Sequence, residues 1–148
     1  MRDLRSSGRL GEPVFEKLDA NLAKAILSIG AVKGFEIGDG FAATKACGSE
    51  NNDEFRMDGD KIVKETNHAG GVLGGISDGS DVVFRAASNR PRLSQSPRRP
   101  SQRTREYRSR DPRRHDPVVV PRAVVVVESM AAITAMDMLL VSMTSRLD

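Results

Sequence analysis

Two short stretches of this sequence carry residue types that could do chemistry, and the first is NHAGGVLGGISDG at residues 67–79. It offers the amide of Asn67, the imidazole of His68 and two glycine pairs, at residues 70–71 and 74–75. Glycine pairs let the backbone approach a flat or phosphorylated ligand without obstruction by side chains. The spacing matches neither the dinucleotide fingerprint nor the P-loop. Two interpretations therefore stay open, a structural turn and a ligand-binding loop.

The second stretch is RRHDP at residues 113–117, where guanidinium, imidazole and carboxylate groups are adjacent. Arg114 could bind a phosphate or a carboxylate through two parallel hydrogen bonds. Asp116 could orient a base or accept a hydrogen bond from a heterocycle. A solvated cluster of charges is the alternative interpretation of this stretch.

Histidine and cysteine are scarce in the chain. His68 and His115 are the only histidines, and Cys47 is the only cysteine. The sequence therefore predicts no metal site and no intramolecular disulfide. A single cysteine is typical of a reducing compartment, so we expect a cytoplasmic protein.

Two helices are expected to frame these stretches. Within residues 13–29 the apolar side chains recur every four residues and predict one helix, with Pro13 in its first turn and Gly30 as its C-terminal cap. The recurring positions are Val14, Leu18, Leu22 and Ile26. A second helix is expected from about residue 122 to residue 143, apolar on most faces and so central.

This second helix bears on membrane association. It contains Glu128 and Asp137, and each would cost about 3 kcal/mol at the centre of a bilayer. We therefore interpret it as a buried helix of a soluble protein and expect no membrane association.

Short apolar runs punctuated by glycine predict strands between the helices. Residues 32–46 are expected to form strands around a turn, and residues 82–87 to form a strand after a tight turn at Asp78-Gly79. Residues 49–61 are polar and typical of a loop, and residues 117–121 are expected to be extended. The pattern indicates an α+β fold with helices packed on antiparallel sheet.

An arginine-rich run separates the strands from the second helix. Residues 88–114 hold ten arginines against Glu106 and Asp111, a net charge of +8, so within a whole-chain charge of +3 the remainder carries −5. Such a run would bind nucleic-acid phosphates without sequence specificity. Tyr107 is its one aromatic residue for base stacking, which argues against an evolved nucleic-acid-binding arm. With so few apolar residues, residues 88–113 are expected to be disordered.

Three stretches together resemble the C-terminal half of chorismate synthase, in order and at similar separations. They are GEPVFEKLDANLAKAILSIGAVKGFEIGDGF, NHAGGVLGGISDG and RHDPVVVPRAVVVVESMAA. The resemblance divides the chain into four parts. These are a divergent leader at residues 1–9, the first part of the family's C-terminal half at residues 10–87, the basic segment at residues 88–113, and a signature loop with a closing helix at residues 114–148.

The resemblance implies a carbon–oxygen lyase of the shikimate pathway, which supplies aromatic amino acid biosynthesis. Its reaction is the 1,4-elimination of phosphate and a proton from 5-enolpyruvylshikimate 3-phosphate to give chorismate. The family requires reduced FMN, which lends electron density transiently, and it assembles as a homotetramer. By position, the resemblance assigns flavin contacts to Gly30, Ala31, Gly74 and Arg114, and it makes Asp116 the catalytic carboxylate near flavin N5.

Two departures from the family bear on activity. The N-terminal half of the family, with two catalytic histidines and several substrate-binding arginines, has no counterpart here, and neither His68 nor His115 matches those histidines. After FRAA at residues 84–87 the family continues with a flavin-binding stretch that contains lysine, threonine and serine, whereas here the basic segment follows. We therefore expect this chain alone to be inactive.

Codon degeneracy suggests how the basic segment arose. If the codons for residues 88–101 are read one nucleotide early, they can encode the family's own residues. The codons for residues 107–113 can do the same in the remaining reading frame. We interpret the segment as an out-of-frame reading of a flavin-binding loop. The alternatives are a non-enzymatic fragment that pairs with a separate N-terminal half, and a basic nucleic-acid-binding arm.

Overall fold

The computed structural model describes residues 9–89 and 119–145, which form helices and small antiparallel sheets. This is the α+β class predicted from the sequence. In chain order the elements are α1 (Leu18–Leu27), β1 (Val32–Ile37), the 3-10 helix η1 (Gly40–Lys45), β2 (Phe55–Asp58), β3 (Lys61–Lys64), β4 (Val72–Leu73), β5 (Ile76–Ser77), β6 (Phe84–Ser88) and α2 (Val120–Thr144).

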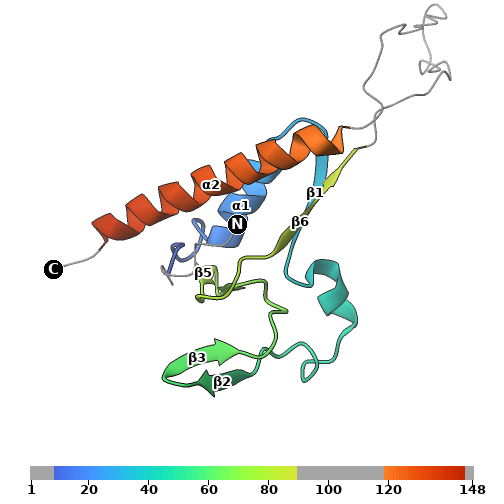
Figure 1. The fold of residues 1–148 in the computed structure, drawn as a ribbon. Helices are drawn as coiled ribbons and strands as arrows, with labels where there is room; N and C mark the ends of the chain where they lie inside the picture. Colours follow the sequence, from blue (N-terminus) through green and yellow to red (C-terminus); the bar gives the residue numbers. More distant parts are fainter. Residues whose placement is uncertain (1–8, 90–118, 146–148) are drawn as a thin grey trace, which may run out of the picture.

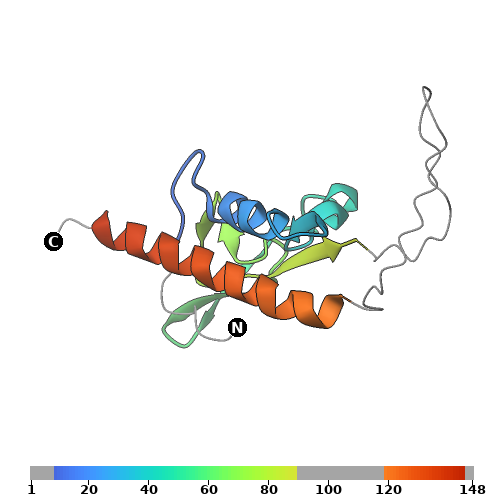
Figure 2. The ribbon, with the colours of Figure 1, turned by 90° about the horizontal axis from the view of Figure 1, so that it is seen from above.

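The core lies where α2 crosses α1, and α2 extends past α1 at both ends (Figures 1 and 2). The buried face of α2 repeats at intervals of three and four residues, which keeps its members on one side of the helix. Those members are Ala131, Thr134, Ala135 and Met138. They meet a cluster from α1, β4 and the segment before α1 that includes Leu10, Leu18, Leu22 and Val72.

Strands β1 and β6 pair antiparallel and bring together two parts of the chain that are far apart in sequence. The register places Ile37 opposite Phe84, and the rings of Phe35 and Phe84 stack with their centroids 5.4 Å apart. Both rings pack against the core cluster. Because β1 and β6 enclose residues 38–83, this pairing anchors both ends of the segment that carries the glycine-rich loop.

The first helix begins at Leu18, so the prediction of a helix from Pro13 was wrong in its first turn. Val14 has a φ of +68°, which a helix excludes. The amide of Leu18 instead donates to the carbonyl of Gly75 at 2.8 Å, because the first amides of a helix need an acceptor from elsewhere. Gly30 is not the left-handed cap either, since the positive φ belongs to Ala31, at +71°.

The polar stretch at residues 49–61 was wrongly predicted to be entirely loop. Its second half forms β2, which pairs with β3 in a hairpin that lies well away from α2 in Figure 1. Phe55 and Met57 alternate with Arg56 and Asp58, and this two-residue period is the strand signal that the surrounding charges masked.

Three smaller differences concern turns and ends. The tight turn falls between β4 and β5, whereas Asp78-Gly79 forms a bend in which the amide of Ser80 donates to the Asp78 side chain. Residues 40–45 form η1 in place of a second strand, and β6 begins at Phe84, two residues later than predicted. Pro121 lies in the first turn of α2 and is not extended, which suits its missing N–H.

Helix α2 is less buried than its composition predicts. It is the one helix of the described ranges that is long and apolar enough to cross a membrane by length and composition, yet only 17% of its most apolar 18 residues are buried. The prediction of a central helix holds for the face against α1 and is wrong for the opposite face.

The basic segment beyond residue 89 lies outside the described residues, as do Arg114 and Asp116. The predictions of disorder at residues 88–113 and of roles for these two side chains therefore stay predictions.

Candidate functional site at the glycine-rich loop

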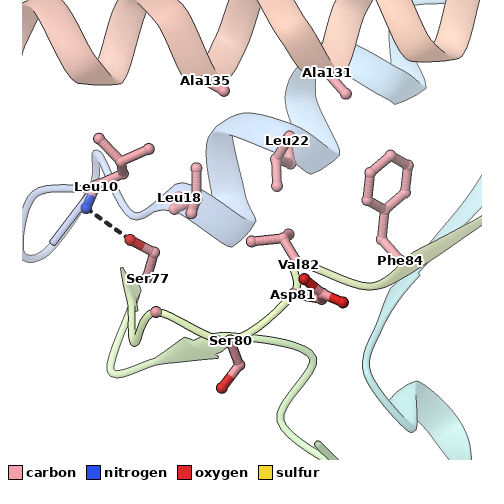
Figure 3. Close-up of a pocket in the computed structure, with 11 residues that line it drawn as sticks. Leu10, Leu18, Leu22, Ser77, Ser80, Asp81, Val82, Phe84, Ala131 and Ala135 are labelled. Carbon is pink, nitrogen blue, oxygen red and sulfur yellow. Dashed lines mark hydrogen bonds between the residues drawn. The ribbon is translucent and has the colours of Figure 1, made fainter. Parts of the chain in front are cut away.

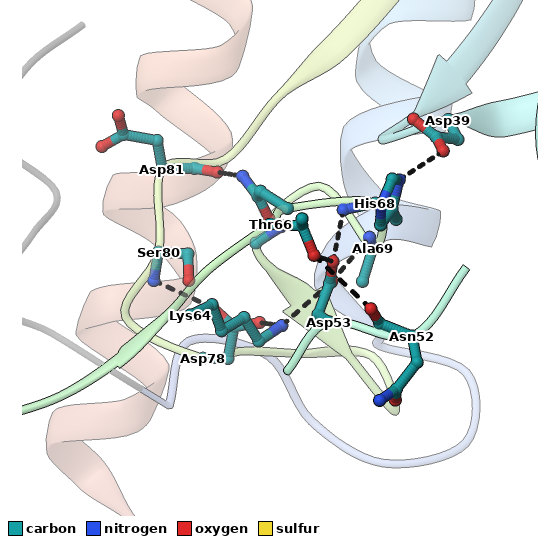
Figure 4. A network of polar contacts seen from close by, with 12 residues as sticks. Asp39, Asn52, Asp53, Lys64, Thr66, His68, Ala69, Asp78, Ser80 and Asp81 are labelled. Carbon is teal, nitrogen blue, oxygen red and sulfur yellow. Dashed lines mark hydrogen bonds and ion pairs between the residues drawn. The ribbon is translucent and has the colours of Figure 1, made fainter. Parts of the chain in front are cut away.

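The start of the glycine-rich loop is held by one carboxylate, that of Asp53. It accepts hydrogen bonds from the hydroxyl of Thr66 at 2.8 Å, the amide of His68 at 2.7 Å and the amide of Ala69 at 3.0 Å (Figure 4). Burial alone would raise the pKa of Asp53. The hydrogen bonds from Ala69, His68 and Thr66, with the charge of Lys64, outweigh burial and lower this pKa to about 2.

Lys64 links this carboxylate to a second one. Its ammonium group lies 3.4 Å from Asp53 and also pairs with Asp78, and the Lys64 and Asp53 side chains are 6% and 7% exposed. Burial would raise the pKa of Asp78, but the hydrogen bonds from Lys64 and Ser80 lower it. Lys64 therefore bridges two carboxylates in a buried site and ties β3 to both ends of the loop.

The first glycine pair is required by packing. Gly70 and Gly71 have φ values of +68° and +78°, and a Cβ atom on either would come within 2.5 Å of backbone atoms of Gly38 or Asp81. Asn67 completes this turn, since its side-chain oxygen accepts from the amide of Gly71 at 2.7 Å and its amide donates to the carbonyl of Asp81. The structural interpretation is therefore correct for this pair.

The second glycine pair differs between its two members. Gly75 packs against Lys17 and accepts the hydrogen bond from Leu18. At Gly74, with a φ of +62°, a Cβ atom would meet no described atom within 4 Å. Gly74 therefore leaves its backbone open to a ligand, as the interpretation of a ligand-binding loop requires.

Gly30 and Ala31, which were also predicted to contact a ligand, lie at the other end of α1. A Cβ atom on Gly30 would meet no described atom within 4 Å, and the carbonyl of Ala31 accepts from the amide of Asn89 at 2.6 Å. Gly75, beside Gly74, bonds to the first residue of α1, and the ten residues of this helix span about 15 Å. The structure therefore does not bring Gly30 and Ala31 together with Gly74.

A carboxylate that the sequence analysis missed lies beside His68. The Nδ1 atom of His68 is 2.7 Å from an oxygen of Asp39, and both side chains are partly exposed (Figure 4). A carboxylate bonded to one ring nitrogen fixes the orientation of the imidazole and leaves the Nε2 atom for a second partner. The only signal in the sequence was an acidic residue between two turn glycines, Gly38 and Gly40.

A small cavity lies between α1, α2 and the chain that leads from β5 to β6, with a volume of about 50 Å³ (Figure 3). Leu18, Leu22, Ala131 and Ala135 line its helical side, and Asp81 is among its polar residues. Ligand pockets usually measure about 300 to 1,000 Å³. This cavity is therefore a gap in the core and does not accommodate a cofactor.

The chain is similar to chorismate synthases by every comparison. The family described as chorismate synthase matches residues 5–140. The chorismate synthase of Lachnospira eligens is 56% identical over 140 residues and that of Agathobacter rectalis 57% over 140 residues, each match covering 94% of this chain and 38% of the relative. The enzyme of Archaeoglobus fulgidus is 51% identical over 138 residues, covering 88% of this chain and 37% of the relative.

The folds agree as well. A crystal structure of chorismate synthase superposes with a TM-score of 0.74 and 32% identity, covering 94% of this chain and 35% of that chain. The chain thus spans about 38% of the length of the curated relatives it matches. With its sequence and its fold both matched over nearly its whole length, the chain belongs to the chorismate synthase family.

Proposed function

We propose that this chain forms part of a chorismate synthase that converts 5-enolpyruvylshikimate 3-phosphate to chorismate by 1,4-elimination of phosphate, with reduced FMN. The observation that carries the proposal is the family match over residues 5–140. Because the chain spans about 38% of its relatives' length, it is proposed to contribute a share of the catalytic site, and the homotetramer of the family is part of the same proposal.

The described residues proposed to contact the flavin are Gly30, Ala31 and Gly74. Their surroundings fit a bulky ligand, since the backbone at Gly30 and Gly74 faces space that no described residue fills. Reduced FMN bound against these residues would supply electron density to the reacting substrate. Because α1 separates Gly74 from the other two residues, the two places have to be tested separately.

Arg114 and Asp116 complete the proposed site. The guanidinium of Arg114 is suited to hold a phosphate or carboxylate in a fixed orientation. The carboxylate of Asp116 is suited to hold or pass a proton beside the reacting atoms. The chemistry depends on the placement of these groups more than on a strong nucleophile.

Two chimeras of the Lachnospira eligens enzyme test this proposal. In the first, the 140 matched residues are replaced by those of this chain. In the second, residues 88–113 of the insert are returned to the relative's own sequence. We expect chorismate formation by the second chimera and at least about 100-fold less by the first, because the basic segment takes the place of a flavin-binding stretch. Failure of the second chimera, if folded and tetrameric, contradicts the proposal.

Glycine variants of the second chimera test the flavin contact at Gly30. Gly30 and Gly48 both lack a positive φ, and a Cβ atom on either would meet no described atom within 4 Å, so the two positions form a matched pair for substitution by valine. Gly30→Val should raise the dissociation constant for FMN about tenfold, whereas Gly48→Val should leave it unchanged. Equal affinities in the two variants would remove Gly30 from the flavin site.

Asp116→Ala in the same chimera should lower turnover by about 100-fold or more, the usual effect of removing an acid or base. Its melting temperature should stay within a few degrees of that of the parent. A parallel loss of stability and turnover would indicate a structural role instead.

A further inference from the structure

The face of α2 that points away from α1 carries a stripe of exposed apolar residues, which Ser129 interrupts between Val125 and Ile133. Its members are between 45% and 63% exposed, whereas a soluble surface helix normally presents polar residues on this side. We call them the outer stripe: Val125, Val126, Ile133, Met136, Leu140 and Met143.

The outer stripe lies opposite the buried face of the helix. Ile133, Met136 and Leu140 each follow a buried residue by two positions, and two residues turn an α-helix by about 200°. Figure 2 shows α1 and β6 on the same side of α2. The β2–β3 hairpin projects on the other side in that view, but Figure 1 shows that it lies well away from α2, so no element of the described chain covers the outer side. A row of exposed large apolar side chains on one face of a helix is typical of an interaction site.

The sheets show the same incompleteness. Each of the three sheets in the described ranges has two strands, and isolated two-stranded ribbons are marginally stable in water. The Lachnospira eligens enzyme matches this chain over 38% of its length, so 62% of that enzyme lies outside the match. This remainder is large enough to supply both further strands and a cover for α2.

We propose that the outer stripe binds the portion of a chorismate synthase polypeptide that lies outside the matched region. The inference rests on membership of the family and not on the proposed reaction, so it can fail or succeed independently of catalysis. A bilayer is a poorer occupant, because Asp137 lies one turn after Ile133 on the border of the stripe and would cost about 3 kcal/mol in hydrocarbon. A second copy of this chain is also a poorer occupant. It would bring a second Asp137 to the same contact, and it would supply no segment that this chain lacks.

Coexpression tests the proposal. The full chain, carrying an affinity tag, is produced together with a Lachnospira eligens chorismate synthase from which the 140 matched residues have been removed. We expect the two to copurify as a stable complex, and the amides of residues 125–143 to gain protection from hydrogen exchange in it. The proposal is overturned if the truncated Lachnospira eligens enzyme stays insoluble or does not bind the chain.

Matched substitutions locate the contact. Ile133→Glu with Met136→Glu changes the outer stripe, and Met57→Glu with Ile62→Glu makes the same changes at residues of similar exposure in the β2–β3 hairpin. All four side chains are well exposed, so both double variants should keep the circular dichroism of the parent chain. The stripe variant should bind the relative's portion at least tenfold more weakly, and the hairpin variant should bind like the parent.

Three results would contradict this assignment. Equal weakening by both double variants would mean that α2 is not the specific contact. Dimers of the chain alone that persist in the presence of the relative's portion would assign the stripe to self-association. Flotation of the chain with phosphatidylglycerol vesicles, lost in the stripe variant, would assign it to a membrane surface.

Discussion

Asp53 organises the glycine-rich loop although it lies 15 residues before His68 in a polar stretch. Three donors from the loop and the ammonium group of Lys64 converge on its two oxygens. Without the carboxylate Lys64 would keep Asp78 as a partner, but the donors of the loop would lose their acceptor, which costs about 1 to 3 kcal/mol for a buried donor. The loop therefore depends on one side chain outside it.

Asp53→Asn should lower the free energy of unfolding by about 2 kcal/mol, because the side-chain NH₂ group would face the Ala69 amide and Lys64 where an acceptor is needed. Asp60→Asn removes the same charge from an exposed turn and should change stability by less than about 0.5 kcal/mol. Urea titrations at pH 7 give both values. Equal stability of the two variants would show that the loop does not depend on Asp53.

The lowered pKa of Asp53 also predicts a pH dependence. Since this pKa is about 2 in the folded chain and 3.8 ordinarily, the charged carboxylate stabilises the fold above pH 3.8, and this stabilisation is lost as the pH falls from 3.8 towards 2. The free energy of unfolding of the parent chain should decline as the pH falls through that interval. The free energy of unfolding of the Asp53→Asn variant should decline less steeply. Parallel curves for the two proteins would contradict the assignment.

Ala31 is an alanine in the left-handed region, which costs an L-residue about 1 to 2 kcal/mol. Ala31→Gly should therefore stabilise the chain by up to about 1 kcal/mol after the entropy of glycine is counted. Ala20→Gly, at an exposed position inside α1, should destabilise it by a similar amount. In thermal melts, Ala31→Gly should raise the melting temperature and Ala20→Gly should lower it. A lower melting temperature for both variants would contradict the prediction.

The β4–β5 turn at Gly74 and the preceding turn at Gly70 contain glycine for different reasons. Gly70 and Gly74 share nearly the same φ, but a Cβ atom on Gly70 would lie 2.4 Å from the Gly38 nitrogen, whereas Gly74 faces open space. Neighbouring backbone atoms thus enclose the turn at Gly70, whereas no described atom covers the backbone at Gly74.

Gly74→Ala should cost about 1 kcal/mol, from backbone strain alone, and Gly70→Ala should cost about 3 kcal/mol or more because a clash is added. Chemical denaturation of the two variants measures the difference. In the second chimera, Gly74→Ala should in addition weaken FMN binding. Similar stability losses at both glycines would show that the turn at Gly70 can relax.

Across its described residues the molecule joins one crossing of α1 and α2 to small sheets and to a helix side that no described element covers. This arrangement fits a chain that matches only part of its relatives' length. Pre-organised groups from several parts of a fold must surround a substrate before elimination can be fast. A partial fold can supply only some of them.

The chain alone should form no chorismate above a control without enzyme when it is supplied with 5-enolpyruvylshikimate 3-phosphate and reduced FMN. The physical reason is that the chain matches about 38% of the relative's length, so any catalytic groups carried by the remainder would not be supplied by it. An anaerobic assay of chorismate, with a full-length relative as the positive control, measures this. Turnover by the chain alone would mean that its own residues suffice.

The family, the α+β class, the centres of both helices and the strand β1 could be predicted from the sequence alone. Each depends on signals carried by neighbouring residues, such as the four-residue repeat from Leu18 to Ile26 and the motif residues around Gly74. The open backbone at Gly74 also agrees with its predicted ligand contact, which stays untested.

The tertiary structure alone decided where α1 begins, which glycine pair is closed by packing, which carboxylates hold the loop and which side of α2 is left uncovered by the described residues. Leu18 begins the helix because Gly75 accepts its amide, and the loop holds its shape because Asp53 accepts from His68. These contacts join residues that are far apart in the chain. Local propensity does not encode such contacts, because their energies exist only once the two partners have been brought together by the fold.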